Sequence, residues 1–557
     1  MQSYFKIFFI ASVLTLVACK TEGVSKKEST AKTAAAPFVW EGANVYFLLT
    51  DRFNNGDTAN DVNFERDEET AVLRDFKGGD IKGITQKIES GYFDDLGVNA
   101  LWFTPVVEQI HGEVNEGTGN TYGYHGYWAK DWTALDPNFG SYEDLEELVN
   151  TAHAHGIRLI MDVVLNHTGP VTEVDPFWGE NWARQEPQCT YAGYESTVEC
   201  TLVANLPDIK TDSNELVEIP NFLAEKWKKE GRFEQEMKEI EAFFKSSGLE
   251  KTPGNYIVKW LTDYVRDLGI DAYRVDTAKH VDEEVWDILK EQGEIAFSSW
   301  KESNPEQVLD STAFFMLGEV YNYSINGARE YDFGDKKVDY YAHGFDNLIN
   351  FQFKYDAKGD YESMFSKYDS ILHGGLKGKS VLNYATSHDD GDPFDKNREL
   401  PYETGTKLLL TPGLSQIYYG DETARDLTIA GTEGDATLRS FMNWEALDST
   451  ETQNILKHWQ MLGSFRKKHP AIGAGRHKMI TQEPYVFYRS YTEGDLNDEV
   501  VVGLDLPRGE KTLKTSNIFS DGSEVRDAYT GITGTVKNGE VMLNTEKTIV
   551  LLEKIKN

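Results

Sequence analysis

The clearest chemical signal of the chain is one segment, Gly269-Ile270-Asp271-Ala272-Tyr273-Arg274-Val275-Asp276-Thr277-Ala278-Lys279-His280. We interpret 270–275 as a short buried strand, because β-branched and aromatic residues dominate it. Alternate side chains of a strand share a face, so Arg274 and Asp276 point the same way. A guanidinium keeps a neighbouring carboxylate ionised, and such a carboxylate at a strand end can be the nucleophile of a covalent glycosidase. A structural ion pair would show the same pattern, so the pair alone leaves both interpretations open.

Other carboxyl groups lie at the ends of further apolar runs. Glu319 ends the run 315–319, where partial desolvation would raise its pKa and suit a general acid. Asp389 follows His388 after another apolar run, and Asp162 opens the sequence Asp162-Val163-Val164-Leu165-Asn166-His167. Each of these residues, taken alone, could instead be a structural loop cap.

The elements that would position these carboxyls alternate between short apolar runs and amphipathic stretches. We expect helices at 142–155 and 255–268, among others, because apolar residues recur there at helical spacing. Strands that alternate with helices over most of the chain predict a (β/α)₈ TIM barrel of the α/β class, which carries its reactive groups at the C-terminal strand ends. The strands are expected at 45–49, 100–103, 159–163, 270–275, 315–319, 345–350, 381–384 and 416–419.

The spacing of the strands divides the chain further. The gap between the third and fourth strands is too long for a plain connection, so we expect an inserted subdomain at 168–254 with a charged helical stretch at 222–244. The barrel would then comprise 37–167 and 255–470. Short apolar and alternating runs at 471–557 predict a C-terminal antiparallel β-sandwich.

The N-terminus has the pattern of a targeting segment. Lys6 precedes an apolar run of about a dozen residues, too short to span a bilayer, which is typical of a signal peptide. The run ends Leu16-Val17-Ala18-Cys19, which resembles a bacterial lipoprotein signal with Cys19 lipidated. We therefore expect a lipoprotein signal at 1–19 and a polar tether at 20–36, with the outer membrane favoured because no acidic residue directly follows the cysteine. An ordinary secretory signal with an incidental cysteine is the alternative.

The composition limits the classes of binding partner and indicates whether the cysteines form a disulfide. The 557 residues carry a formal net charge of −36, which argues against nucleic acid and against electrostatic docking on anionic lipid. Cys189 and Cys200 are the only other cysteines, and two cysteines this close in an exported chain suggest one disulfide. We expect a monomer that attaches to a membrane only through its lipid.

Taken together and in this order, the motifs resemble glycoside hydrolase family 13, the α-amylase family. Three segments are most similar to periplasmic bacterial α-amylases: Leu49-Thr50-Asp51-Arg52-Phe53-Asn54-Asn55-Gly56-Asp57, Glu108-Gln109-Ile110-His111-Gly112, and Val275 to His280. The four signature regions of the family correspond to 162–167, 269–280, 318–320 and 387–389. A fifth, Leu206-Pro207-Asp208-Ile209, lies in the predicted insert, and Tyr124-His125-Gly126-Tyr127-Trp128 matches a substrate-contacting motif.

The resemblance implies a role for each matched residue. Asp276 would be the nucleophile, Glu319 the acid/base and Asp389 the stabiliser of the transition state. Substrate contacts are implied for Arg274, His125, Tyr127, Trp128, His167, Lys279, His280 and His388.

The resemblance also implies one or two Ca²⁺ sites, and clustered oxygen ligands suit that ion. In the first, Asn166, Asp208 and the carbonyl of His280 would clamp the ion between barrel and insert. The second would use Asn55, Asp57, Asn60, Asp61, Gly78 and Asp80, although a turn rich in Asp and Asn without metal is the alternative there.

These expectations describe a calcium-dependent, retaining endo-α-amylase that cuts α-1,4-glucosidic bonds in starch, glycogen-like glucans and maltodextrins. A transglycosylase of the same family, forming cyclodextrins or maltooligosaccharides, is the first alternative. A surface lipoprotein that binds glycans without catalysis is the second, and the presence of all three carboxylates weighs against it.

Overall fold

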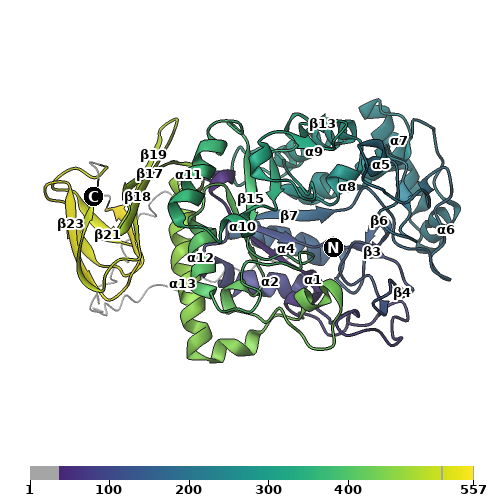
Figure 1. The fold of residues 1–557 in the computed structure, drawn as a ribbon. Coiled ribbons are helices and arrows are strands. Elements are labelled where there is room, and N and C mark those ends of the chain that lie inside the picture. Colours follow the sequence, from purple (N-terminus) through teal and green to yellow (C-terminus); the bar gives the residue numbers. More distant parts are fainter. Residues whose placement is uncertain (1–36, 516–517, 556–557) are drawn as a thin grey trace, which may run out of the picture. The chain divides into compact units, whose positions relative to one another are not determined.

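The computed structural model describes residues 37–515 and 518–555. Within them, eight parallel strands form a closed barrel, and their order around it is β1, β2, β7, β10, β11, β14, β15 and β16. Strands β7 and β15 of this barrel are labelled in Figure 1. The predicted (β/α)₈ barrel is confirmed. The strands are β1 (Asn44–Leu48), β2 (Ala100–Phe103), β7 (Arg158–Val163), β10 (Ala272–Val275), β11 (Phe315–Gly318), β14 (Asn347–Asn350), β15 (Ser380–Tyr384) and β16 (Leu414–Tyr418).

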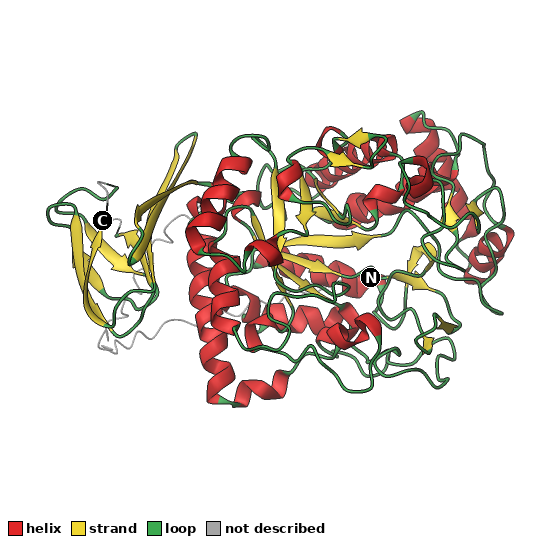
Figure 2. Cartoon of the chain, in the orientation of Figure 1, coloured by secondary structure: helices red, strands yellow, loops and turns green. Residues whose placement is uncertain are grey.

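Helices flank the barrel strands, as the red and yellow elements of Figure 2 show. Every residue of the eight barrel strands is buried, which explains why the sequence shows apolar runs and not strict alternation. The longer helices in this part of the chain are α2 (Ile81–Glu89), α4 (Tyr142–Ala154), α8 (Pro253–Leu268), α9 (Glu283–Ser303), α11 (Tyr361–Leu372), α12 (Pro401–Leu410) and α13 (Thr450–Lys468).

Helix α8 delivers the chain to the strand that precedes Asp276. It begins with Pro253, which needs no N–H at this position, and ends at Gly269 in the left-handed region at φ 81°. A Cβ on Gly269 would collide with the Trp300 ring, so both conformation and space require glycine there. The strand was expected from residue 270 but begins at Ala272. The Asp271 carboxylate instead accepts a hydrogen bond from the Leu159 amide and contacts the His153 ring.

The segment between β7 and α8 contains β8 (Ala183–Arg184), α5 (Glu195–Val198), β9 (Asp208–Ile209), α6 (Asn221–Glu230) and α7 (Phe233–Ser247). The single helical stretch expected at 222–244 is wrong, because Gly231 adopts φ 76° and separates α6 from α7. A disulfide joins Cys189 to Cys200. This segment packs against α8 through aromatic side chains: the rings of Trp182 and Trp260 are stacked, with their centroids 6.0 Å apart.

The C-terminal part is antiparallel, as expected. A six-stranded sheet is formed by β17 (Arg476–Thr481), β18 (Tyr485–Glu493), β19 (Leu496–Leu504), β24 (Val550–Lys554), β21 (Glu524–Asp527) and β22 (Thr533–Thr535). A second pair comprises β20 (Gly509–Lys514) and β23 (Glu540–Thr545). Apolar side chains from both sheets, such as Val501, Leu513 and Leu543, share one buried cluster.

Candidate active site

The two central carboxyls follow neighbouring strands. Strands β10 and β11 pair in parallel with Val275 opposite Gly318, so Asp276 and Glu319 occupy the next matched positions. The Glu319 amide donates to the Val275 carbonyl at 2.9 Å, which extends this register by one residue. Because paired strands lie about 4.8 Å apart, the two carboxyls share one side of the barrel mouth. Asp389 comes from the loop after β15.

Arg274 connects the acidic residues. Its Nη1 lies 2.8 Å from both Asp162 Oδ1 and Asp276 Oδ1, and its Nη2 lies 3.0 Å from Glu319 Oε2. The side chain is 1% exposed, so its charge acts with little screening by water. The predicted Arg274–Asp276 pair is therefore part of a larger unit, in which one guanidinium holds carboxyls from three adjacent strands.

Asp162 anchors this unit, a role that its sequence motif alone does not indicate. It accepts hydrogen bonds from the Tyr127 hydroxyl at 2.8 Å and the Trp102 indole at 3.0 Å, besides Arg274. Burial raises the pKa of Asp162 to about 7, while Arg274 opposes that shift. These contacts occupy the carboxylate with protein groups, so Asp162 orients Arg274 and Tyr127 and is not a candidate for attack on a substrate.

Glu319 has the environment of a general acid. Burial, the largest cause, raises its pKa well above the ordinary value, and the charges of Asp276 and Asp389 add to that effect. Arg274 and the Thr277 amide, which donates to Glu319 Oε2 at 2.8 Å, act in the opposite direction. Thr277 reaches this position with φ 48°, an uncommon conformation for a β-branched residue.

Three neutral histidines contact Tyr127, whose hydroxyl binds Asp162. Burial lowers the pKa of His125, His167 and His388, so each ring stays uncharged at neutral pH. His125 Nδ1 accepts from the Tyr127 amide at 3.0 Å, which leaves the proton on Nε2. The His388 ring stacks on that of Tyr127 at 5.4 Å.

Trp128 was expected to contact the substrate, but its side chain is buried. It is 4% exposed and packs in a cluster with Ile110 and Leu206, while its ring meets His125 edge-on at 4.7 Å. Its indole therefore supports His125 and does not offer a face to a sugar. The reason is the adjacent loop of the insert, which covers this side of the ring.

A cavity of about 540 Å³ opens beside Glu319. Lys279 Nζ stands in it, 5.7 Å from the ring of Tyr191, 5.1 Å from that of Tyr321 and 5.7 Å from that of Tyr331. The three tyrosines were not anticipated, because they come from separate segments with no shared pattern. Flat rings and a cation beside Glu319 suit the hydroxyls and faces of sugars. The lining residues are Tyr191, Leu202, Thr277, Lys279, His280, Glu319, Tyr321, Asn322 and Tyr331.

The first expected calcium site shows a convergence of oxygens. The Asn166 side-chain oxygen lies 2.9 Å from the His280 carbonyl oxygen and 3.2 Å from Asp208 Oδ1, with no donor between them. Either the oxygen and nitrogen of the Asn166 side-chain amide are exchanged, so that the nitrogen donates to both oxygens, or a cation binds between the three oxygens. Asp208 is 2% exposed, and burial raises its pKa well above the ordinary value although Arg184 opposes that shift, so a cation at its Oδ1 would offset more of the desolvation. The residues fit Ca²⁺.

The second expected cluster also collects oxygens. Asn55 Oδ1 and Asn60 Oδ1 are buried without a hydrogen-bond partner among the described residues, and Asp61 Oδ1 accepts from Asn55 Nδ2 at 2.8 Å. A Cβ on Gly78 would come within 2.6 Å of Asp61 Oδ1, so this glycine lets the backbone approach the cluster. Asp80 has another task, since its carboxylate accepts the amides of Gly56, Asp57 and Gly83 and caps α2. Asp57 pairs with Lys82 at 3.1 Å.

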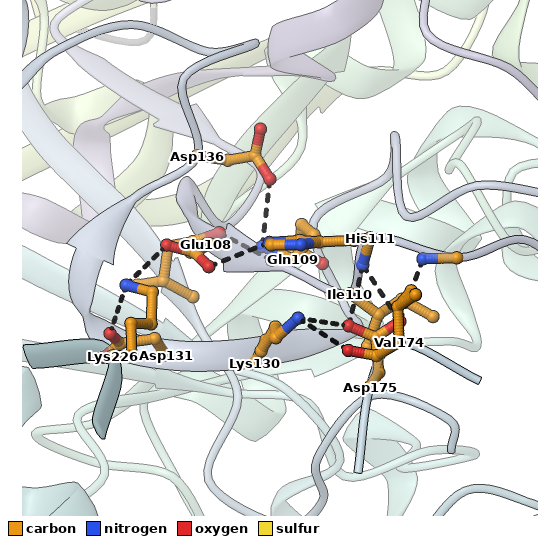
Figure 3. Close-up of polar contacts among 12 residues, drawn as sticks. Glu108, Gln109, Ile110, His111, Lys130, Asp131, Asp136, Val174, Asp175 and Lys226 are labelled. Carbon is orange, nitrogen blue, oxygen red and sulfur yellow. Dashed lines mark hydrogen bonds and ion pairs between the residues drawn. The ribbon is translucent and has the colours of Figure 1, made fainter. Parts of the chain in front are cut away.

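The segment 108–112 is structural. Glu108 and Gln109 lie in β3 (Val107–Gln109), which pairs with β6 (Ala129–Leu135). Figure 3 shows the polar contacts of this segment. Glu108 binds His111 Nε2 at 3.0 Å and Lys226 Nζ at 2.8 Å, and Lys226 also reaches Asp131 at 2.8 Å. These contacts connect the barrel loop to helix α6 of the insert, and none of them involves Asp276, Glu319 or Asp389.

Comparisons with known proteins agree with this geometry. Residues 47–460 match the sequence model of the alpha-amylase catalytic domain. The chain is 35% identical over 548 residues to the periplasmic alpha-amylase of Escherichia coli (strain K12), covering 87% of this chain and 75% of that protein. It is 27% identical over 521 residues to a cyclomaltodextrin glucanotransferase of Thermoanaerobacterium thermosulfurigenes, covering 88% of this chain and 64% of that protein.

Solved structures show the same fold. The alpha-amylase of Geobacillus thermoleovorans, in complex with acarbose, superposes with a TM-score of 0.65 at 20% identity, covering 93% of this chain and 100% of that one. An Anoxybacillus alpha-amylase gives a TM-score of 0.64 at 22% identity, covering 94% of this chain and 100% of that one. The family match and the 35% identity show that the chain belongs to the α-amylase family, glycoside hydrolase family 13.

Proposed function

We propose that the protein is a retaining endo-α-amylase that hydrolyses α-1,4-glucosidic bonds in starch-like glucans and maltodextrins. The observation that carries the proposal is the pairing of Asp276 and Glu319 with one buried guanidinium at adjacent strand ends. A retaining glycosidase needs such a closely spaced pair, one carboxyl as nucleophile and the other as acid/base. Similarity to a periplasmic alpha-amylase supports the choice of substrate.

The reaction follows from the two environments. Asp276, in contact with Arg274, attacks the anomeric carbon while Glu319 gives its proton to the glycosidic oxygen, and the bond between that carbon and that oxygen breaks. The products of this step are a glycosyl ester on Asp276 and a free sugar hydroxyl. Glu319 then takes a proton from water, which displaces Asp276 and releases the second product with its original configuration. Asp389 would hold the hydroxyls of the distorted ring.

Incubation with maltoheptaose, followed over time, tests this function. The first products should be internal cleavage fragments, and proton NMR of the fresh reducing ends should show the α anomer. Release of the β anomer would contradict the double displacement and with it the nucleophilic role of Asp276.

Transglycosylation is the second candidate function, and the cavity around Lys279 favours it. Three tyrosine rings there could hold a sugar acceptor near Glu319 and exclude water from the glycosyl ester. Similarity to a cyclomaltodextrin glucanotransferase, of whose length the chain covers 64%, supports the same idea. Products longer than maltoheptaose in the same time course would show transfer.

We further propose that calcium stabilises the fold, chiefly through Asn166, Asp208 and the His280 carbonyl. An ion that binds only the folded state stabilises it by mass action, about 2.7 kcal/mol at a hundredfold excess over Kd. Chelator is therefore expected to lower the melting temperature by several degrees, and added Ca²⁺ should restore it. Calorimetry with metal analysis of the protein measures both.

Asp208 and Asp212 provide a matched comparison, because both carboxylates contact Arg184 but only Asp208 faces Asn166. Asp208→Asn should reduce the response of the melting temperature to calcium, whereas Asp212→Asn should keep it. An identical melting curve with and without chelator, for protein that contains no calcium, would refute the proposal.

Export with a lipid anchor at Cys19 is proposed as the location. Cys19 and the tether at 20–36 lie outside the described residues, and the similarity to a periplasmic enzyme supports export. No helix among residues 37–515 and 518–555 has the length and hydropathy of a membrane span. A lipidated cysteine buries many methylenes at about 0.8 kcal/mol each, so two or more acyl chains suffice for stable attachment.

Cys19→Ser is accordingly expected to move amylase activity from the membrane fraction to the soluble fraction of cells. The redistribution is measured by assaying both fractions after cell lysis. Wild-type activity that is already soluble would show that Cys19 belongs to an ordinary, discarded signal.

A further inference from the structure

A buried lysine stands behind the loop that carries Asp389. Lys354 lies in the short helix α10 (Phe353–Asp356), directly after β14, and is 4% exposed. Its ammonium pairs with Oδ1 of Asp390, the residue next to Asp389. A lysine this buried is rare without a partner, and Asp390 supplies one.

Asp390 is held from a second side. The Tyr384 hydroxyl, at the end of β15, donates to Asp390 Oδ2 at 2.6 Å, and the Asp392 amide donates to Oδ1 at 3.1 Å. Asp389 itself has fewer anchors among the described residues, since its side chain is 33% exposed and accepts a hydrogen bond from the Ser387 hydroxyl alone, at 3.1 Å. The position of Asp389 therefore depends on its two neighbours: Asp390, and His388, whose carbonyl accepts a hydrogen bond from Arg439 Nε at 2.9 Å.

The same cluster reaches Glu319 through packed rings. Tyr321 meets Phe351 edge-on at 5.2 Å, and Phe351 meets Tyr384 at 5.7 Å. After burial, the charges of Asp390, Asp389 and Glu319 all raise the pKa of the Tyr384 hydroxyl, so the three carboxyls lie within electrostatic reach of one point. Without Lys354, Asp390 would add an unbalanced negative charge to this group.

We propose that Lys354 is a positioning residue of the active site: its ion pair with Asp390 fixes the loop bearing Asp389 and balances the charge of Asp390, which acts on the same tyrosine hydroxyl as Asp389 and Glu319. This inference rests on the proposed glycosidase function. The charged and titratable groups that face Asp390 and Glu319 are Lys354, Tyr384, Tyr321, Arg274, Asp276, Asp389 and Lys279.

The charges of Lys354 and Asp390 predict the direction in which each variant shifts the pH profile. In Lys354→Met, the Asp390 carboxylate loses its cationic partner, and its uncompensated charge makes loss of the Glu319 proton harder. Because Glu319 must be protonated to act as the acid, the alkaline limb of the kcat/KM profile should move to higher pH. In Asp390→Asn, the unpaired ammonium of Lys354 should move it to lower pH. The double variant Lys354→Met/Asp390→Asn lacks both charges and should return the limb to its wild-type position.

The rates provide a second readout. A misplacement of about 1 Å costs on the order of 10²-fold in rate, so Lys354→Met should lower kcat on maltoheptaose by roughly tenfold to a hundredfold with KM little changed. Lys354→Arg keeps the charge and should recover most of this loss. Lys358→Met is the matched control, because Lys358 is exposed and lies only four residues further along the chain.

The outcomes separate the inference from the function on which it rests. A wild-type enzyme that does not cleave maltoheptaose refutes the function. With active wild type, an alkaline limb that stays in place in Lys354→Met and Asp390→Asn overturns the inference. If Lys354→Met does not fold, Asp390→Asn and the double variant still decide the question through the position of that limb.

Discussion

Asp276→Asn is expected to lower kcat on maltoheptaose by roughly 10³-fold or more, the scale of losses seen when a nucleophile is removed. The amide has nearly the shape of the carboxylate but cannot form the glycosyl ester. Arg274 retains Asp162 and Glu319 as partners, so no buried cation is left alone. The fold should remain intact, and circular dichroism together with steady-state kinetics would measure both effects.

Asp271→Asn is the matched control for this variant, since Asp271 lies at the opposite end of the same strand region. Its carboxylate contacts His153 and the Leu159 amide, which makes its role one of stability. It should lower the melting temperature and leave kcat nearly unchanged. Asp276→Asn protein that keeps more than about a tenth of the wild-type rate would show that another group is the nucleophile.

The barrel could be predicted because its strands are buried on both faces. Apolar runs such as 100–103 and 315–318 therefore mark the strands directly, and polar residues such as Glu319 follow at their C-terminal ends. The ends of strands and helices were harder to predict where a local turn interrupts an otherwise continuous pattern. The left-handed turn at Gly269 shortens β10, and Gly231 divides a stretch whose helical periodicity looks continuous.

The site could be predicted only in part, because its members come from separate segments. The Arg274–Asp276 pair is local, but the contacts of Arg274 with Asp162 and Glu319 depend on the register of three strands. The cavity tyrosines at 191, 321 and 331 share no local pattern. Trp128 belongs to a clear motif, yet the insert loop that buries it is far away in sequence.

Glu319→Gln should test two consequences of the burial of this carboxyl, one for catalysis and one for stability. General acid–base catalysis contributes roughly 10² to 10⁴-fold, so kcat on maltoheptaose should fall within that range. With a maltosyl fluoride as substrate, Glu319→Gln should slow the first step much less, because fluoride leaves without a proton. Asp276→Asn should lose activity on both substrates, which distinguishes the nucleophile from the acid.

The second consequence is a pH-dependent gain in stability. The folded-state pKa of Glu319 is raised, chiefly by burial, above its value in the unfolded chain, about 4.3. The stability that its protonated form contributes is complete below the unfolded pKa and is lost as the pH rises through the folded pKa. The amide that replaces this carboxyl in Glu319→Gln does not titrate, so the melting temperature of the variant relative to wild type should increase from pH 4 towards neutral pH.

Glu291→Gln serves as the control for that measurement, because Glu291 is exposed on α9 and its substitution should leave the pH dependence of melting unchanged. A melting temperature of Glu319→Gln that falls relative to wild type as the pH rises would mean that the ionised carboxylate stabilises the fold through Arg274 and Thr277. Glu319 would then be ionised in the resting enzyme, and the proton for the leaving group would have to come from another residue. Melting and activity of the same variant therefore test one statement about Glu319: that burial keeps its proton in place until the glycosidic oxygen takes it.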